Sequence, residues 1–413
     1  MNNFTKYGNV YRLLGGRIAT NIADSLFYMS ILWHFKEITN STLVVSIIFA
    51  ITSGIDTISF GFGPLIDRIS IKRLLKISTC IQILISIGIV VMLTINIRNI
   101  IVSILILILF TISSILSSVV YPAEDKLLPL FVSEREVLRF NGIFQLTYKV
   151  LDIALDAFVT VIITITSINI TVIFSGIVFA IALYFYSNLK IKVIAKKVLE
   201  EEEYFTGSYI KDLLIGWKTL KEQKTILELI LPICVINLFY GIFMVGLPYF
   251  AQSYVKNSAL GYGALLFASS LGSILGALLV QKFKIGKEEM HVFVALCFLG
   301  AGIFRLIVPL AITLNVWIIL FASAISSAWI TMMNINFESL VQLSFSSSVL
   351  GRVQTINYSI LSVMIPIGSI LGGWIVRLWG SLCTQYIYGI SLLLCALYYI
   401  LVIKRKPDMS AEE

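Results

Sequence analysis

Long stretches without a charged residue recur along the whole sequence. The run from Ile100 to Val120 is apolar on every face that a helix would present. Of the 413 residues, 58% are hydrophobic and only 13% are charged, which is too apolar for a water-soluble chain of this length. The runs also lack the period-2 alternation of an outer-membrane barrel. These patterns exclude a water-soluble enzyme and predict an all-α polytopic membrane protein.

The apolar runs have the length of membrane-spanning helices. A helix needs about 20 residues to cross the hydrocarbon core, so we expect twelve transmembrane helices. They lie near residues 12–35, 43–66, 74–95, 99–121, 142–166, 169–189, 226–250, 258–280, 291–311, 314–336, 354–377 and 381–403. Most of the 31 Lys and Arg residues fall on one side of these spans, which places the N- and C-termini in the cytoplasm. We expect no cleavable signal peptide, because the first apolar run carries Arg17 and Asp24.

The spans divide into two halves of six. A lysine-rich connector, residues 190–225, separates the bundle 1–189 from the bundle 226–403, and a cytoplasmic tail follows at 404–413. A shift of about 213 residues aligns Arg139 with Arg352, and Ser25–Tyr28 with Asn237–Tyr240, which indicates a parallel pseudo-repeat. In the connector, helical spacing predicts an amphipathic helix on the inner membrane surface, with a solvated linker as the alternative; its apolar residues are Leu213, Leu214, Trp217 and Leu220.

The loop after the second predicted span resembles the signature G-x-L-x-D-R-x-G-R-K of the major facilitator superfamily. The sequence matches this pattern at Gly63, Leu65, Asp67, Arg68 and Lys72, and departs from it at Ser70 and Ile71. The resemblance implies the major facilitator fold, with two six-helix bundles. It also implies that Gly63, Asp67, Arg68 and Lys72 form a gating motif that latches the cytoplasmic side of the protein.

Other stretches look like the macrolide-efflux branch of that superfamily, which includes drug–proton antiporters. They comprise Arg17, Thr20, Asp24, Trp33 and Thr39 in and after the first span, and Pro366, Gly368, Gly372 and Gly373 in the eleventh. Span 5 departs from these relatives, because the stretch Tyr148–Asp156, which includes Asp152 and Asp156, stands where they carry a Gly-Pro and Gly-Gly pattern. The resemblance implies export of a small amphipathic or cationic molecule in exchange for protons.

Ionisable residues inside the spans are candidates for substrate and proton binding, because a charge near the bilayer centre costs at least about 2.5 kcal/mol. The helical rise places Asp24, Asp56 and Asp156 near mid-membrane. We expect Asp24 and Asp156 to line the cavity and to bind a proton and a cationic substrate in turn. The alternative is that these carboxylates form buried ion pairs with Arg17 and Lys149 that orient the helices.

The positions of these residues along their helices refine the predictions. Lys149, Asp152 and Asp156 share one helical face, where Lys149 can neutralise Asp152 and leave Asp156 freer. Asp56 lies on a helix at the boundary between the halves of this fold. For this residue, pairing with span 11 is an equal alternative to a role in substrate or proton binding. Arg17 and Asp24 share a face but lie two turns apart, too far for direct contact along a straight helix.

Aromatic residues and one further arginine complete the candidates. Phe27, Tyr28, Phe239 and Tyr240 can stack on a planar substrate, with helix packing as the alternative. For Arg305 we expect snorkelling toward the outer interface, and binding of an anionic substrate group is the alternative.

These features predict a secondary transporter in a bacterial plasma membrane, acting as a monomer with a small-molecule substrate and protons. The alternative cargo is an endogenous metallophore, siderophore or peptide-like metabolite, which suits the charges of span 5. A non-transporting receptor or scaffold would leave the mid-membrane carboxylates unexplained. We expect no cofactor, metal site or enzymatic activity, since the cysteines lack metal-ligand spacing. Nucleic acid is not an expected partner either, because the net charge of +8 reflects basic residues retained on the cytoplasmic side.

Overall fold

The protein is helical throughout the part of the chain that the structure, a computed structural model, describes. That part omits residues 1–6, 40, 60–69, 96–98, 133, 191–216, 257, 281–284, 287–288, 346 and 406–413. Within it, the regular elements are α-helices and short 3₁₀ segments, such as the turn at Leu128–Leu130. The chain separates into two compact units, residues 1–40 with 55–207 and residues 41–54 with 208–413.

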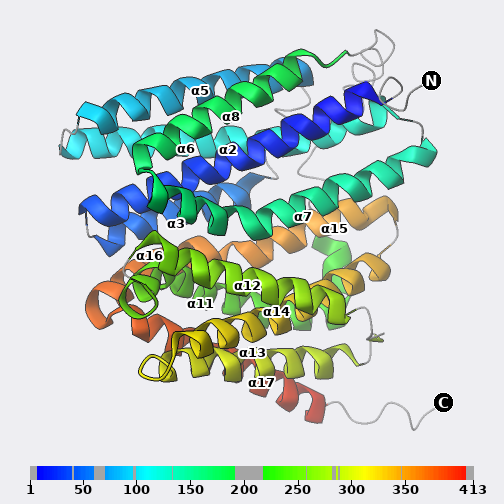
Figure 1. Cartoon of the computed structure of the whole chain (residues 1–413). Helices are drawn as coiled ribbons and strands as arrows, with labels where there is room; N and C mark the ends of the chain where they lie inside the picture. Colours follow the sequence, from blue (N-terminus) through cyan, green and yellow to red (C-terminus); the bar gives the residue numbers. More distant parts are fainter. Residues whose placement is uncertain are drawn as a thin grey trace. The chain divides into compact units, whose positions relative to one another are not determined.

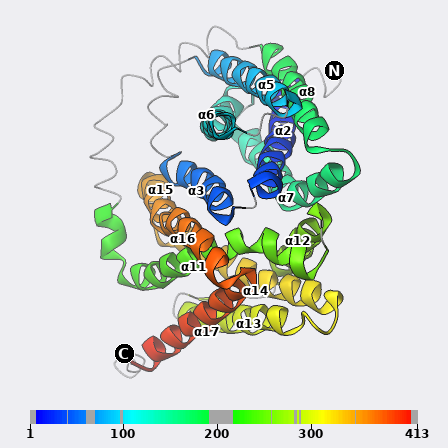
Figure 2. The ribbon, with the colours of Figure 1, turned by 90° about the vertical axis from the view of Figure 1, so that its left-hand side faces the viewer.

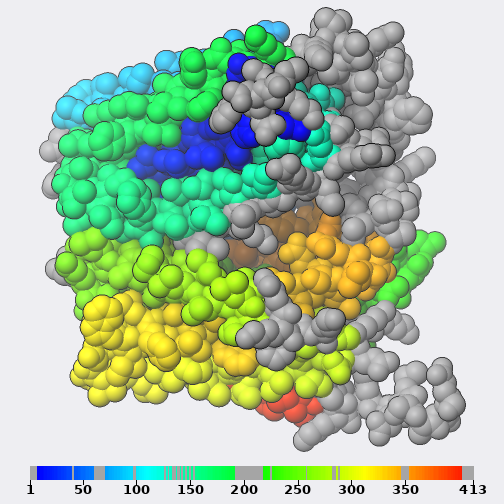
Figure 3. Space-filling model, turned by 45° about the vertical axis from the view of Figure 1, so that its right-hand side comes forward, coloured from blue at the N-terminus to red at the C-terminus, as the bar shows by residue number. Residues whose placement is uncertain are grey.

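The first unit is a helical bundle in which α2 occupies a central place. Its helices are α2 (Gly8–Thr39), α5 (Ile71–Ile95), α6 (Ile100–Leu127), α7 (Glu134–Ile165) and α8 (Ile168–Ser187). The helix α2 packs between α8 and α7, which the space-filling view shows as a dark-blue band between two green ones (Figures 1 and 3). Figure 2 looks along α6, with α5 and α2 beside it. Side chains on the buried face of α2 therefore contact several neighbouring helices. These contacts position any polar group on that face.

The helix starts in this unit follow local sequence signals. The Asn99 side chain accepts a hydrogen bond from the Ile101 N–H at 2.9 Å and caps α6. In the same way, Ser167 accepts from the Ile170 N–H at 3.3 Å and caps α8. These two polar residues precede long apolar runs, so the chain enters each span at a defined residue.

The second unit contains the remaining helices. They are α3 (Thr42–Ile58), whose residues up to 54 belong here, α11 (Lys224–Tyr254), α12 (Ala259–Val280), α13 (Met290–Leu310), α14 (Val316–Ser344), α15 (Ser347–Ser362), α16 (Met364–Trp379) and α17 (Ser381–Arg405). The backbones of α11 and α16 approach closely at Gly368, where an added Cβ would lie 1.9 Å from the Leu238 carbonyl oxygen. Small residues at helix crossings permit this contact, as is usual in membrane bundles.

Each predicted span coincides with a helix of the described chain, and the all-helical prediction is confirmed. Nine of the described helical segments are long and apolar enough to cross a membrane. The other three predicted spans fall on α2, which carries several charges, on α3, described over 17 residues, and on α7, whose apolar part is Ala154–Ile165. Length and composition thus support a multi-pass membrane protein.

The prediction of a single helix for residues 354–377 is wrong in detail. The segment comprises α15 and α16, which meet at Val363. The cause is Pro366, which lacks an N–H group for the carbonyl of Ser362 and whose ring would clash with that carbonyl in a regular helix. The two pieces still make one span, Val353–Trp379.

The end of the fourth span and the connector helix were also predicted. The fourth span does not end at residue 121, because α6 continues through Pro122 to Leu127. The predicted connector helix lies mostly outside the described residues, but residues 217–222 are helical, with Trp217 exposed and Leu220 buried.

Candidate functional site

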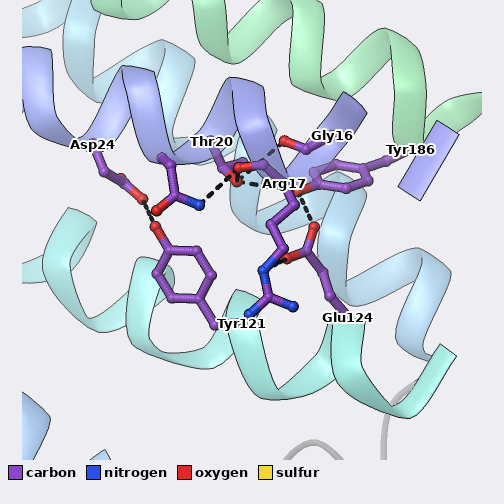
Figure 4. A network of polar contacts seen from close by, with 8 residues as sticks. Gly16, Arg17, Thr20, Asp24, Tyr121, Glu124 and Tyr186 are labelled. Carbon is purple, nitrogen blue, oxygen red and sulfur yellow. Dashed lines mark hydrogen bonds and ion pairs between the residues drawn. The ribbon is translucent and has the colours of Figure 1, made fainter. Parts of the chain in front are cut away.

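A polar network lies inside the first unit, on the face of α2 that carries Arg17, Thr20 and Asp24 (Figure 4). These three residues are separated by three and four positions, so they lie one above another along the helix. Side chains from α5, α6 and α8 reach this face and are described below. The network therefore joins four segments that are distant in the sequence.

Asp24 is half-buried and accepts hydrogen bonds from three uncharged donors. Its Oδ1 accepts from the Gln82 amide at 3.2 Å and from the Ser117 hydroxyl at 2.6 Å. Its Oδ2 accepts from the Tyr121 hydroxyl at 3.0 Å (Figure 4). Ser117 and Tyr121 are one turn apart on α6, so a single helical face supplies both donors. Among the described residues, no basic side chain pairs with this carboxylate.

Arg17 pairs with a different acid, Glu124 of α6. The Arg17 Nε lies 3.8 Å from Glu124 Oε2, and both side chains are buried, Arg17 at 5% exposure and Glu124 completely. Tyr186 of α8 donates its hydroxyl hydrogen to Glu124 Oε1 at 2.6 Å (Figure 4). The Tyr186 hydroxyl also lies 3.4 Å from the Thr20 hydroxyl. Glu124 is thus held by a cation and a phenol and has a fixed counter-charge.

Tyr121 connects the two acidic groups. Its hydroxyl donates to Asp24, and the Arg17 guanidinium lies 5.9 Å from the centre of its ring. A second ring, that of Phe144, lies 5.7 Å from the same guanidinium. Cation–π contacts of this kind favour a desolvated arginine. Among the described residues, Glu124 therefore has a cation beside it, whereas Asp24 has only neutral hydrogen-bond donors.

Sequence reasoning missed Glu124, Gln82, Ser117, Tyr121 and Tyr186. Glu124 follows Pro122, and a proline inside a helical pattern usually marks the end of the helix. Here α6 continues past it, and the added turn buries the carboxylate. The one available signal was Arg17 itself, because a cation inside a span requires a counter-charge near the same membrane depth.

The predicted group on span 5 is described only in part. Asp156 of α7 is half-buried and accepts a hydrogen bond from the Ser25 hydroxyl at 2.5 Å. The side chains of Lys149 and Asp152 lie outside the described residues, so their expected pairing remains a prediction. Since Ser25 follows Asp24 directly, Asp156 contacts α2 at the level of Asp24.

The other predicted charged residues lie at the ends of helices or outside the described residues. The Asp56 side chain is exposed, near the end of the described part of α3. Lys72 donates from Nζ to the Leu189 carbonyl and so ties the start of α5 to the end of α8. The remaining residues of the predicted gating motif, Gly63, Asp67 and Arg68, lie outside the described residues.

Three of the four candidate aromatic residues lie beside another ring of the same unit. Phe27 is buried, and its ring stacks on that of Phe110 with centroids 6.2 Å apart. Tyr28 is half-buried, with its centroid 6.4 Å from the same ring. In the second unit Phe239 is half-buried, and the Tyr240 ring lies 5.9 Å from that of Tyr388.

The expectation that Arg305 snorkels outward is wrong. Arg305 of α13 is only 4% exposed, and its guanidinium carbon lies 4.5 Å from the centre of the Phe243 ring. The Tyr388 ring is 5.8 Å away. Because α13 packs against α17 and α11 packs against both α16 and α17, the side chain points into the second unit. A buried cation there is a second place where ligand chemistry is to be sought.

A family model described as the Major Facilitator Superfamily matches residues 13–367. A mutant of the peptide transporter POT in complex with alafosfalin is similar, with TM-score 0.71, 12% identity and coverage of 98% of this chain and 96% of that one. So is a bacterial homologue of the iron transporter ferroportin in an inward-facing state, with TM-score 0.68, 14% identity and coverages of 96% and 99%.

A third similar structure is the xylose transporter XylE from E. coli in an inward-open conformation, with TM-score 0.65, 12% identity and coverages of 96% and 97%. At these identities the likeness concerns the fold alone. No curated protein matches the chain.

Proposed function

Because the chain belongs to the Major Facilitator Superfamily, we propose that it exports a small amphipathic or cationic molecule, drug-like or macrolide-like, in exchange for protons. The observation that supports this proposal is the setting of Asp24. This carboxylate lies inside the first unit and is half-buried, and its hydrogen-bond donors among the described residues are all neutral. Its negative charge is available to a proton or to a cationic group of the substrate.

In this proposal, the proton and the substrate compete for Asp24, and this competition couples their opposite movements across the membrane. When ionised, the carboxylate accepts from Gln82, Ser117 and Tyr121 and attracts a cation. When protonated, it carries no charge, and the oxygen that bears the proton becomes a donor. The substrate then loses its counter-charge, and one of the three donors loses an acceptor. Proton and substrate therefore bind in turn, which is the requirement for exchange by alternating access.

Asp156 is the proposed second acceptor, with Asp152 and Lys149 beside it on α7 and Asp56 as a further candidate. Arg17 has a positioning role, because its contacts with Glu124 and Tyr121 hold the donor of Asp24 in place. Phe27, Tyr28, Phe239 and Tyr240 are the proposed aromatic contacts of the substrate.

We also propose the wider setting of this transporter. The protein lies as a monomer in the lipid bilayer of a bacterial plasma membrane, with both termini cytoplasmic, as the distribution of Lys and Arg predicts. The functional bundles are residues 1–189 and 226–403, joined by the connector 190–225 and followed by the tail 404–413. Gly63, Asp67, Arg68 and Lys72 latch the cytoplasmic gate.

A second candidate cargo is an endogenous zwitterion, such as a peptide-like metabolite or a metallophore. The observation that favours it is Arg305, a buried cation in the second unit that a purely cationic substrate would not require.

The test uses inside-out membrane vesicles with an imposed proton gradient, acidic inside. The readouts are the accumulation of ethidium, a lipophilic cation, or erythromycin, a macrolide, and the accompanying proton efflux. We compare wild type, Asp24→Asn and the matched carboxylate control Glu222→Gln, which changes an exposed side chain. Accumulation that Asp24→Asn abolishes and Glu222→Gln retains supports the proposal. Gradient-driven accumulation that survives in Asp24→Asn refutes the role of Asp24, and no accumulation in wild type refutes the proposed drug-like cargo.

A further inference from the structure

Arg305 lies in an aromatic enclosure built by three helices of the second unit. The Phe243 and Tyr388 rings stack with centroids 4.9 Å apart and an interplanar angle of 22°. The Tyr240 ring lies 6.2 Å from that of Phe243 and 5.9 Å from that of Tyr388. The Arg305 guanidinium faces the first two rings, so α13 supplies the cation and α11 and α17 supply the wall.

This cation has no acidic counterpart in the described part of the chain. The Arg305 Nε has no hydrogen-bond partner there, and no carboxylate lies within ion-pair distance of the guanidinium. Glu289 lies 16 positions earlier, about 24 Å away along the helix axis. Glu228 pairs with His291, near the same end of α13 as Glu289. The acids near the Met290 end of α13 therefore cannot neutralise Arg305.

Gln385 provides a second unsatisfied polar group close by in the fold. It lies three positions before Tyr388 on α17, so both side chains share one helical face. Its side chain is completely buried, and neither its amide oxygen nor its nitrogen has a hydrogen-bond partner among the described residues. Buried polar groups are normally paired, and polar or ionisable groups buried within a span are rare, so such groups are candidates for ligand binding.

We propose that Arg305 and Gln385 form a binding site for a carboxylate of the transported molecule, whose planar apolar part packs against Phe243 and Tyr388. This inference rests on the proposed transport function and narrows the cargo to an amphipathic zwitterion or aromatic acid. Arginine suits the task, because its planar fork donates two parallel hydrogen bonds to a carboxylate while its face stays on an aromatic ring. The amide N–H of Gln385 adds a further donor.

The experiment measures binding to the full-length protein in lipid nanodiscs, separately from transport. The probe is benzoate, which combines a carboxylate with a planar ring; benzamide, its uncharged counterpart, and sulfate, an anion without a ring, serve as controls at equal ionic strength. We expect benzoate to raise the thermal unfolding temperature of wild type in a saturable way, and the controls to leave it unchanged. Equal protection by benzamide or by sulfate, or none by benzoate, overturns the proposal.

Variants localise the site. Arg305→Gln should abolish benzoate protection, whereas Arg377→Gln, a matched change of an exposed arginine on α16, should leave it unchanged. Arg305→Lys keeps the charge but loses the fork, and we expect at least about tenfold weaker binding. Gln385→Leu, which removes only the amide, should weaken binding about fivefold and provides a test if Arg305→Gln does not fold. Unchanged binding in Arg305→Lys and Gln385→Leu contradicts the inference.

The two proposals can fail separately. If the protein binds benzoate through Arg305 but shows no proton-coupled accumulation of ethidium or erythromycin, the carboxylate site is supported and the proposed drug export is refuted. If it accumulates these compounds through Asp24 but does not bind benzoate, the drug export is supported and the carboxylate site is refuted.

Discussion

Removal of the Glu124 charge should destabilise the first unit through Arg17. The substitution Glu124→Gln preserves the size of the side chain and an acceptor oxygen for the Tyr186 hydroxyl, but it removes the carboxylate that lies 3.8 Å from Arg17 Nε. Because the guanidinium cannot lose its proton, Arg17 stays charged within a buried network.

The magnitude follows from burial and from the contacts that remain. Breaking a buried ion pair by removing one partner costs about 3–5 kcal/mol. The Tyr121 and Phe144 rings still face the guanidinium, and such cation–π contacts stabilise the buried cation by about 1 kcal/mol. We therefore expect Glu124→Gln to lower the free energy of unfolding by about 3 kcal/mol. The double variant Arg17→Gln with Glu124→Gln should lie within about 1 kcal/mol of wild type, because a neutral pair needs no counter-charge.

The assay is reversible unfolding of the full chain of wild type, both single variants and the double variant in mixed micelles by increasing fractions of dodecyl sulfate, followed by tryptophan fluorescence at pH 7. A loss below about 1 kcal/mol in Glu124→Gln, or single-variant losses that simply add in the double variant, would show that Arg17 and Glu124 are not energetically coupled.

Two further predictions use the same measurement at pH 7. Tyr186→Phe removes the 2.6 Å hydrogen bond to Glu124 and should lower the free energy of unfolding by about 1.5–3 kcal/mol. The control Tyr398→Phe, at a side chain 44% exposed, should lower it by less than about 0.5 kcal/mol. Equal effects of the two variants would contradict the buried network. Gly368→Ala places a methyl group against the Leu238 carbonyl and should cost about 1–3 kcal/mol, while Gly88→Ala, which meets open space within a helix, should stabilise by about 0.5–1 kcal/mol. A neutral Gly368→Ala would mean that α11 and α16 do not approach so closely.

Local sequence patterns predicted the helices well, because each span is encoded by a contiguous apolar run. The caps at Asn99 and Ser167 are local too, as is the break before Pro366, although that break was missed when the run 354–377 was taken as one helix. Continuation of α6 through Pro122 was not predictable in this way, since neighbouring helices decide whether a helix tolerates a proline.

By itself, the sequence determined that this chain is a polytopic helical membrane protein of the Major Facilitator Superfamily and that Arg17, Asp24 and Asp156 lie within its spans. The tertiary structure decided their partners: Arg17 with Glu124, Asp24 with three neutral donors, Asp156 with Ser25, and Arg305 with a wall of aromatic rings. The physical reason is that helix formation and membrane insertion depend on neighbours in sequence. Whether a buried charge is neutralised depends instead on which helices pack face to face, and residues as distant as Arg17 and Glu124 meet only after that packing.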